Sequence, residues 1–326
     1  MQSFLGVDVS KAKLDVALLL SSGKFKSKTF ANDRNGFEAL RLWLQELLPQ
    51  GLESLHVCME ATGAYHEALA CTLHDQGLRV SVVNAWLVKR FAEVSRLRNK
   101  TDGGDAKCLA QFCKAQAPQP WQAPSASVRA LQALVARLDT LQVMRQAEAN
   151  RLAVAHGAVQ DSLTRMIAEL DQAIAQVKQH IARTIDDDPD LKRRAALLDS
   201  IPGLGERSIA QLLAYIGRPQ RFTGVKALSA YAGLTPMIRQ SGSSLNKGRG
   251  THPMGHRELN RALYFPAMVA GQHNPLVRAF WHRLKAQGKP GKVVVVACMH
   301  KLLAIAFAVL RSGQPFNAEH LKPLRT

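Results

Sequence analysis

The chain has 326 residues, enough for two or three domains, and 47% of them are hydrophobic, which suits folded cores of ordinary size. Its 43 lysines and arginines against 25 acids give a formal net charge of +18, which favours a polyanionic partner, nucleic acid before a membrane surface. The five cysteines are odd in number and form no CxxC pair, which argues against a disulfide framework or a zinc ribbon; they are Cys58, Cys71, Cys108, Cys113 and Cys298. Charged residues also interrupt the N-terminus where a signal peptide needs its apolar core, so we expect a cytoplasmic protein.

Residues 1–124 are expected to form an α/β domain. Three strands, SFLGVDV, KLDVALLL and KFKSKTF, predict a meander that opens the domain. Periodicity then predicts helices at 35–48, 65–77, 85–96 and 105–116, and strands at 54–60 and 78–84. The later strands need parallel crossovers to join a central sheet.

Acidic residues close two of these strands. Alternation puts Asp8 on the face of Gly6, and Glu60 on the face of Cys58. If the two strands are neighbours in the sheet, the two carboxylates meet at one strand end. Asp15 is left out of this set, because its own alternation partners indicate the outer face.

Two further acids stand in NKTDGGDAK, residues 99–107, directly after a basic run. Asp102 and Asp105 are three residues apart, which places both on one face of a helix. Taken singly, each acid is also typical of a helix cap or a solvated face. As a set of four, the carboxylates would repel one another unless cations held them, and oxygen ligands of this kind suit Mg²⁺, with Mn²⁺ as the second choice. The neighbouring Arg98 and Lys100 are expected to contact phosphate.

Residues 125–186 contain no proline and one glycine. Their apolar residues recur at helical intervals and predict two long helices that form an antiparallel coiled-coil arm. The acidic stretch DDDPD that follows is interpreted as a linker.

Residues 187–326 are expected to form a helical domain with one long polar loop. The apolar run at 293–310 is interrupted by His300 and Lys301, so it predicts a buried helix and not a membrane span. From Ser241 to the end, 13 lysines and arginines stand against 2 acids, a net charge of +11. So much charge in one segment indicates an anion-binding surface.

The stretch IPGLGERSIAQLLAYIG has the form of a helix-hairpin-helix. Gly203 and Gly205 allow a close backbone turn, and the following helix offers N–H groups to a phosphate. The alternative is an ordinary tight connection between two helices.

The polar loop RQSGSSLNKGRGTHPMGH is rich in glycine and serine, with Arg239, Lys247 and Arg249 as its cations. Such a composition is also typical of a plain linker. His252 and His256 suggest a metal site, but no third ligand lies nearby in the sequence, so phosphate contacts are favoured.

Six segments together resemble the DEDD transposases of the insertion-sequence one-ten family, relatives of the Piv-type DNA invertases. They cover essentially the whole chain in the expected order: GVDVSKAKLDVAL, CMEATGAYHEAL, LRNKTDGGDAKCLAQF, IPGLGERSIAQLLAYIG, YAGLTPMIRQSGSS and GHRELNRALYFPAMVA.

The resemblance implies a RuvC-like domain of ribonuclease H fold at 1–124, a coiled-coil insertion at 125–186 and a C-terminal transposase domain at 187–326. The family's four acids match Asp8, Glu60, Asp102 and Asp105, and its nucleophilic serine matches Ser241. In this family the serine of one subunit is thought to meet the carboxylates of another, and its attack on a DNA phosphate stores the bond as a phosphoserine ester.

The function implied is that of a recombinase of a mobile element, which excises and inserts its element through a circular intermediate. A structured RNA from the element's own noncoding end would pair with donor and target DNA. A synapse of two DNAs implies a dimer that assembles to a tetramer, at the nucleoid in the cytoplasm and without a membrane.

Three other classes stay open at this level. A resolvase-like nuclease acting on Holliday junctions would need the four acids but not Ser241, and a non-catalytic DNA-binding regulator would need neither. GVDVSK also resembles the phosphate-loop strand of actin-like or sugar kinases, but the glycine-rich adenosine motifs expected later in such a chain are missing.

Overall fold

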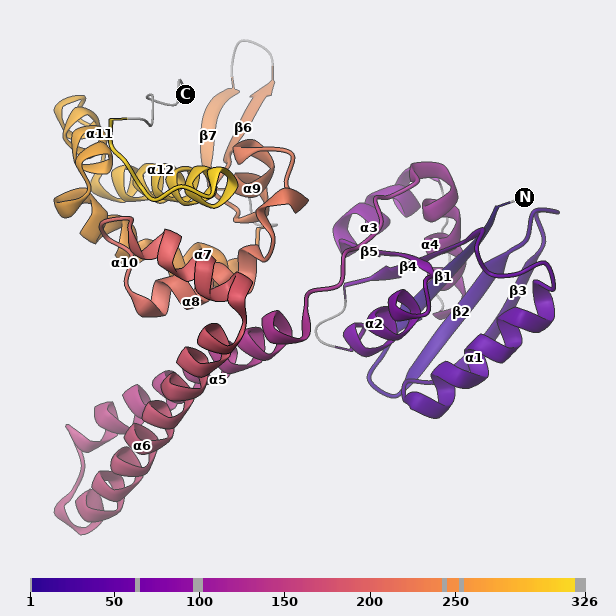
Figure 1. Ribbon diagram of the computed structural model, residues 1–326, viewed down its shortest axis with the longest axis horizontal. Helices are drawn as coiled ribbons and strands as arrows, with labels where there is room; N and C mark the ends of the chain where they lie inside the picture. Colours follow the sequence, from indigo (N-terminus) through magenta and orange to yellow (C-terminus); the bar gives the residue numbers. More distant parts are fainter. Residues whose placement is uncertain (1, 62–64, 96–101, 242–244, 252–254, 320–326) are drawn as a thin grey trace. The chain divides into compact units, whose positions relative to one another are not determined.

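The computed structural model describes residues 2–61, 65–95, 102–241, 245–251 and 255–319; for residues 102–103 and 236–251 it describes the backbone alone. The chain forms two compact units, residues 1–123 and residues 124–326 (Figure 1). The predicted arm and C-terminal domain both fall in the second unit, and as separate domains they stay predictions.

The first unit is built on a five-stranded sheet in the order β3-β2-β1-β4-β5. The predicted meander is confirmed, because β1 (Ser3–Val9), β2 (Lys13–Leu19) and β3 (Phe25–Ala31) pair antiparallel. The predicted crossovers are confirmed too, since β4 (Leu55–Glu60) and β5 (Arg79–Val83) join in parallel. The sheet is therefore mixed, with β1 at its centre.

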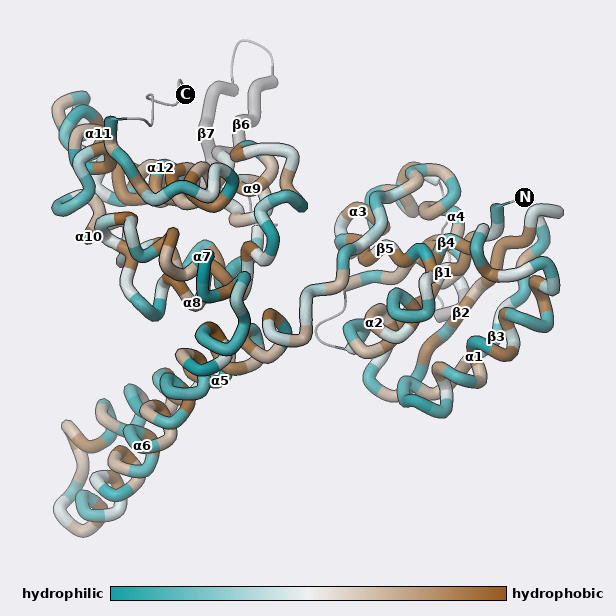
Figure 2. Tube along the Cα trace, viewed as in Figure 1, coloured by the Kyte–Doolittle hydropathy of each residue, from teal (hydrophilic) through white to brown (hydrophobic). Residues whose placement is uncertain are grey.

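Helices cover both faces of this sheet. On one face α1 (Arg34–Leu47) and α2 (Glu67–Asp75) share an apolar core with side chains from all five strands. On the other face α3 (Ala85–Val94) and α4 (Asp102–Gln116) pack around Cys58. Because both faces are covered there, β1, β2 and β4 carry long hydrophobic stretches, while the edge strand β3 is mostly exposed (Figure 2).

The second unit opens with two long helices, α5 (Ala126–Leu152) and α6 (Gly157–Asp187), which lie side by side as a hairpin (Figure 1). Ser125 caps α5 by accepting a hydrogen bond from the Val128 N–H at 3.3 Å. An ion pair of 2.9 Å joins Arg145 of α5 to Asp171 of α6. The two predicted helices are confirmed, while their supercoiling as a coiled coil stays a prediction.

The rest of the second unit is mainly helical, as predicted: α7 (Pro189–Asp199), α8 (Glu206–Ile216), the short 3₁₀ helix η1 (Pro219–Arg221), α9 (Val225–Tyr231), α10 (Arg257–His273), α11 (Pro275–Ala286) and α12 (Gly291–Ser312). The apolar run at 293–310 forms α12, which is long and apolar enough to cross a membrane, yet 67% of its most apolar window is buried inside the unit. Its Cys298, Leu302 and Leu303 are fully buried, so the predicted core helix is confirmed.

Two predictions for this unit are wrong. The stretch DDDPD is no linker, because α6 runs to Asp187 and Asp188 already caps α7, accepting hydrogen bonds from the N–H groups of Asp190 and Leu191. The polar loop is no plain loop either, since it pairs as the antiparallel strands β6 (Pro236–Ser241) and β7 (Leu245–Thr251). In both places the residues that favour loops also serve as caps or hairpin strands.

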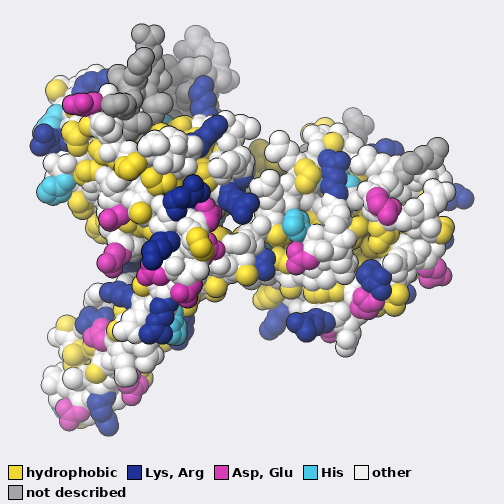
Figure 3. All heavy atoms as spheres, viewed as in Figure 1, with side chains coloured by type: hydrophobic (Ala, Val, Ile, Leu, Met, Phe, Trp, Pro, Cys, Tyr) yellow, Lys and Arg dark blue, Asp and Glu magenta, His cyan; other side chains and the backbone are white. Residues whose placement is uncertain are grey.

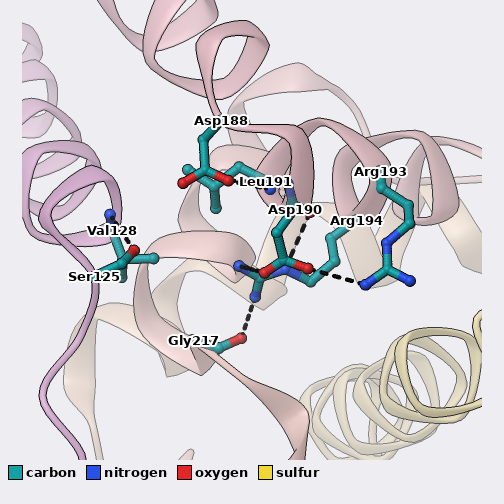
Figure 4. Close-up of polar contacts among 8 residues, drawn as sticks. All are labelled: Ser125, Val128, Asp188, Asp190, Leu191, Arg193, Arg194 and Gly217. Atoms are coloured by element: carbon teal, nitrogen blue, oxygen red, sulfur yellow. Dashed lines mark hydrogen bonds and ion pairs between the residues drawn. The ribbon is translucent and has the colours of Figure 1, made fainter.

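A buried arginine joins α7 to the end of α8 (Figure 4). Arg194 donates to the carbonyl of Gly217, just past α8, and its guanidinium lies 3.0 Å from the carboxylate of Asp190. Burial lowers its pKa from the ordinary arginine value. The neighbouring Arg193 pairs with the same acid, but its side chain is 71% exposed, so it contributes little to stability. The buried guanidinium, through its hydrogen bond to Gly217, therefore fixes α7 against the end of α8.

Candidate active site

Two acids end adjacent parallel strands at the same edge of the sheet. The register pairs Gly6 with Cys58 and Val7 with Met59, so Asp8 and Glu60 form the next pair along β1 and β4. Residues paired in this way point to the same face of a sheet. Both acids are partly exposed. The sequence therefore places two carboxylates side by side, on the face that α4 covers.

The backbone of α4 lies directly on β1 at Gly6. A Cβ atom on Gly6 would lie 2.0 Å from the carbonyl oxygen of Ala106 and 2.5 Å from the amide nitrogen of Ala110. Only glycine permits this approach, because any side chain would occupy the space of the helix backbone. The first turn of α4, directly before Ala106, is thus held beside the strand that carries Asp8.

The remaining two acids lie in that first turn. Asp102 is the first residue of α4 and Asp105 the fourth, so the predicted helical spacing is present in the backbone. The side chain of Asp102 lies outside the described part. The Asp105 carboxylate is close enough to raise the pKa of the Cys108 thiol, although burial of that thiol is the larger cause.

The prediction for Asp15 was wrong about its face. Asp15 pairs with Asp8 across β1 and β2, and opposite residues of an antiparallel pair point to the same face. Its carboxylate accepts a hydrogen bond from Thr29 Oγ1 at 2.6 Å and forms an ion pair with Lys13 at 3.0 Å. These partners give Asp15 a structural role beside the site.

Sequence reasoning missed a residue that holds this edge together. Asn32 donates from Nδ2 to the carbonyls of Ser10, at 2.8 Å, and of Tyr65, at 3.1 Å. Ser10 directly follows β1 and Tyr65 lies shortly after β4, so one amide joins the segments that follow both acid-bearing strands. No sequence pattern marks Asn32, which stands alone before the Asp33 cap of α1.

The two glycines of the predicted helix-hairpin-helix have different surroundings. Gly203 has φ +103°, and a Cβ there would lie 2.7 Å from Ala270 of α10, so this glycine is packed against the core. Gly205 caps α8, and a Cβ there would meet nothing within 4 Å. Of the two, Gly205 is the one open to a ligand; the helix-hairpin-helix itself stays a prediction.

The candidate serine lies on the β6–β7 hairpin. Ser241 is the last residue of β6 and pairs with Leu245, while Arg239 pairs with Lys247. Arg249 lies further along β7. Their side chains lie outside the described part, as do the residues Arg98, Lys100, Ser243, Ser244 and His252.

The two ends of the hairpin approach each other closely through their backbones. A Cβ on Gly255 would lie 2.0 Å from the Cα of Gly233, and the His256 N–H donates to the Tyr231 carbonyl at 2.7 Å. His256 is no metal ligand here: its Nδ1 caps α10 by accepting from the Leu259 N–H at 3.2 Å. Burial lowers its pKa, which favours the neutral ring that such a cap needs.

Comparisons with known proteins identify the family. Residues 5–155 match a family model described as Transposase, and residues 195–282 match one described as Transposase IS116/IS110/IS902 family. A pilin gene-inverting protein of Moraxella lacunata is 33% identical over 318 residues, which cover 97% of this chain and 98% of that protein. The chain belongs to the IS110 family of transposases. The protein is therefore an enzyme that transposes or recombines DNA. A non-catalytic regulator and a kinase are both excluded by this class of enzyme.

The transposase also matches a second mobile-element protein and a solved structure. The mini-circle putative transposase for IS117 of Streptomyces coelicolor is 28% identical over 230 residues, which cover 67% of this chain and 55% of that protein. Among solved structures, T. thermophilus RuvC in complex with Holliday junction substrate is 11% identical to the chain. The match covers 37% of this chain and 100% of that chain, with a TM-score of 0.28. That score is too low to support an argument.

Membership of a DEDD transposase family brings a requirement for a divalent metal. The donors at the sheet edge are carboxylates only, and such oxygen ligands fit a hard cation. Within the described part of the chain, no three histidine, cysteine, aspartate or glutamate side chains form a metal-binding group. The donor set fits in kind, but the side chains of Asp8, Glu60 and Asp105 do not by themselves form such a group, and the side chain of Asp102 lies outside the described part.

The contact at Gly6 generates a test of this geometry. Gly6→Ala is expected to lower the free energy of unfolding by about 1–3 kcal/mol, because its methyl group forces α4 away from β1. Urea unfolding of the full transposase, followed by circular dichroism, measures the loss, and DNA recombination is expected to fall with it.

Gly157→Ala is the matched control, since Gly157 starts α6 with open space around a Cβ. This variant is expected to be neutral or stabilised by about 0.4–1 kcal/mol. Equal stability of Gly6→Ala and the parent would contradict the close packing of α4 on β1.

Proposed function

We propose that this transposase excises and inserts an insertion sequence by serine-dependent strand exchange, guided by an RNA that its own element encodes. The observation that carries the proposal is the sheet edge at which Asp8 and Glu60 end adjacent strands while α4 rests on Gly6. The joint presence of strand-end acids and a helix beginning with two more acids suits phosphodiester chemistry.

The first unit is proposed to be a RuvC-like domain of ribonuclease H fold. The antiparallel meander followed by two parallel strands, in the order β3-β2-β1-β4-β5, supports this assignment. In the second unit, α5 and α6 are proposed to act as a coiled-coil arm, and α7 and α8 as a helix-hairpin-helix that contacts DNA near Gly205.

Asp8, Glu60, Asp102 and Asp105 are proposed to hold Mg²⁺, or Mn²⁺ in its place. A divalent cation supplies positive charge to the attacking and leaving oxygens of a phosphodiester. Carboxylates gathered at one sheet edge repel one another, and a divalent cation offsets that repulsion. Asn32 acts as a positioning residue, because it joins the segments after β1 and β4.

Ser241 is proposed as the nucleophile. Its Oγ attacks the phosphorus and loses its proton, while the bond from phosphorus to the leaving deoxyribose oxygen breaks and that oxygen takes up a proton. The resulting phosphoserine ester keeps the bond energy, so a hydroxyl of another strand can attack the same phosphorus and release the serine. Arg239, Lys247 and Arg249 share the hairpin and are proposed to offset the phosphate charge, as Arg98 and Lys100 do beside the carboxylates.

The serine and the acids are proposed to come from different subunits. The hairpin belongs to the second unit and the carboxylates to the first, and a synapse needs two DNAs. A dimer that assembles to a tetramer on donor and target DNA would satisfy both conditions. We place this assembly in the cytoplasm, at the nucleoid.

Guidance by RNA is proposed from the family resemblance and from charge. The segment from Ser241 onward carries a net +11, and a surface of this kind binds a nucleic-acid backbone without reading its sequence. Space-filling Figure 3 shows lysine and arginine side chains on both units. Sequence choice would then rest on base pairing by the RNA, as in other guided systems.

A first test addresses the metal. Asp105→Asn is expected to keep the fold but to lower recombination by about 100-fold or more, because one oxygen ligand loses its charge. Calorimetric titration with Mn²⁺ gives a readout independent of activity and is expected to show weakened binding. Asp15→Asn is the matched control on the same face and is expected to bind Mn²⁺ like the parent. Equal Mn²⁺ affinity for Asp105→Asn and the parent would remove the metal assignment.

A second test separates recombinase from nuclease. Ser241→Ala is expected to bind DNA and RNA normally, because one hydroxyl adds little to binding dominated by charge, yet to form no covalent adduct and no recombinant product. Ser243→Ala, two residues away, is the control and is expected to retain activity. A denaturing gel with peptide mapping of the adduct measures this. Recombination by Ser241→Ala, or an adduct on another residue, would favour the resolvase-like nuclease.

A third test addresses the guide. The transposase purified from cells that carry the complete element is expected to contain one RNA from the element's noncoding end. Sequencing of the co-purified nucleic acid identifies it, with cells that carry the gene alone as the control. Recovery of random cellular RNA from both sources would count against guidance while leaving recombination intact.

A further inference from the structure

A groove of about 1180 Å³ opens in the second unit at the base of the β6–β7 hairpin. It is larger than the cavities of roughly 300–1,000 Å³ that usually hold small ligands. Three helices, α5, α8 and α10, supply its walls, and Gly233 and Gly255 line it where the hairpin begins and ends. The groove therefore lies next to the segment that carries Ser241.

The groove has an excess of positive charge without ion-pair partners. Three arginines line it against two acids. One of these acids, Asp139, is already engaged, because it accepts from Arg207 at 2.7 Å. Arg257 and Arg261 are exposed and form no ion pair with any described residue. Since they are four residues apart on α10, both guanidinium groups project from one helix face.

Two exposed aromatic rings stand in the same groove. Tyr264 is 39% exposed and Phe265 is 73% exposed, and their rings meet edge to face at 5.5 Å. Val143 of α5, 58% exposed, adds an apolar side chain to the opposite wall. Single exposed apolar side chains are common, but a contiguous group of them is typical of an interaction surface.

Guanidinium groups beside exposed aromatic rings are the combination that holds an unpaired nucleotide. Arginine binds the phosphate, and the ring offers a flat face on which a base stacks. Bases within a duplex already stack on their neighbours, so an aromatic ring gains contact only with a base that has left the duplex.

We infer that this groove holds an unpaired nucleotide of the DNA strand that Ser241 attacks. Its phosphate lies against Arg257 and Arg261, and its base against Tyr264 and Phe265. The inference rests on the proposed function for its choice of strand, because exchange of strands requires locally opened DNA and the groove adjoins the hairpin. The groove thereby keeps the opened strand from re-pairing.

Photochemical cross-linking tests the position of the nucleotide in the unmodified full chain. The probe is a single-stranded oligothymidylate of about 12 nucleotides with one central 5-iododeoxyuridine, a length within the site sizes of single-strand binding proteins. Tryptic cleavage after Arg261 and Arg278 isolates residues 262–278, which include both rings. We expect the main cross-link in this peptide; cross-links only elsewhere in the chain would overturn the assignment.

Variants then measure what the groove contributes to binding. Phe265→Ala is expected to lower affinity for the same oligothymidylate by about 5- to 100-fold, as stacking losses do in other single-strand binding proteins. Met144→Ala is the matched control, because Met144 is an exposed apolar residue of α5 that does not line the groove. Equal affinities of the two variants in anisotropy titrations would overturn the inference.

Two further experiments test whether the groove holds RNA or a second copy of the chain instead. Tighter binding and stronger cross-linking of an oligouridylate RNA would assign the groove to RNA, and a changed sedimentation coefficient of Phe265→Ala with unchanged DNA affinity would assign it to a second copy of the chain; either result overturns the inference. Binding needs no chemistry, so every arm is repeated with Ser241→Ala. An adduct on another residue would refute the proposed nucleophile while the cross-link in 262–278 stayed unchanged.

Discussion

The first unit depends on one contact between two backbones, that of α4 with β1 at Gly6. With a carbonyl oxygen 2.0 Å from the position of a Cβ, no side chain separates helix from strand, and none can adjust if either moves. Around this contact α4 completes the core that holds Cys58 and Cys113, and it starts with the two acids of its first turn. The proposed active site thus depends on residue 6 having no Cβ atom.

Much of this unit was predictable because its signals are local. Strand alternation and turn residues predicted the meander and the acids that end β1 and β4. The face of Asp15 was not predictable in this way: β2 is buried on both faces, so its sequence shows no clean alternation between core and solvent. Asn32 was missed because its partners Ser10 and Tyr65 lie 22 and 33 residues away, and no local pattern reports such contacts.

The second unit was harder to predict for a different physical reason. Its aspartates and glycines have several uses, so DDDPD resembled a linker where Asp188 serves as a helix cap, and the serine-rich stretch resembled a loop where its strands pair. The groove could not be found at all from α10 alone. In the sequence, Arg257 and Phe265 look like parts of a solvated helix face. They line a groove because Asp139 and Val143 of α5 lie opposite them in the structure.

Gly233 and Gly255 anchor the β6–β7 hairpin at its base, outside its two strands. Both ends of the hairpin are held by glycine backbone and by the bond from His256 to Tyr231, so the residues between them are not needed to close the loop. A hairpin of another length or sequence is compatible with the packing of α9 and α10 if it keeps Leu234, which is buried in the core directly after Gly233. The proposed nucleophile Ser241 thus lies on a segment whose anchoring contacts stand outside its two strands.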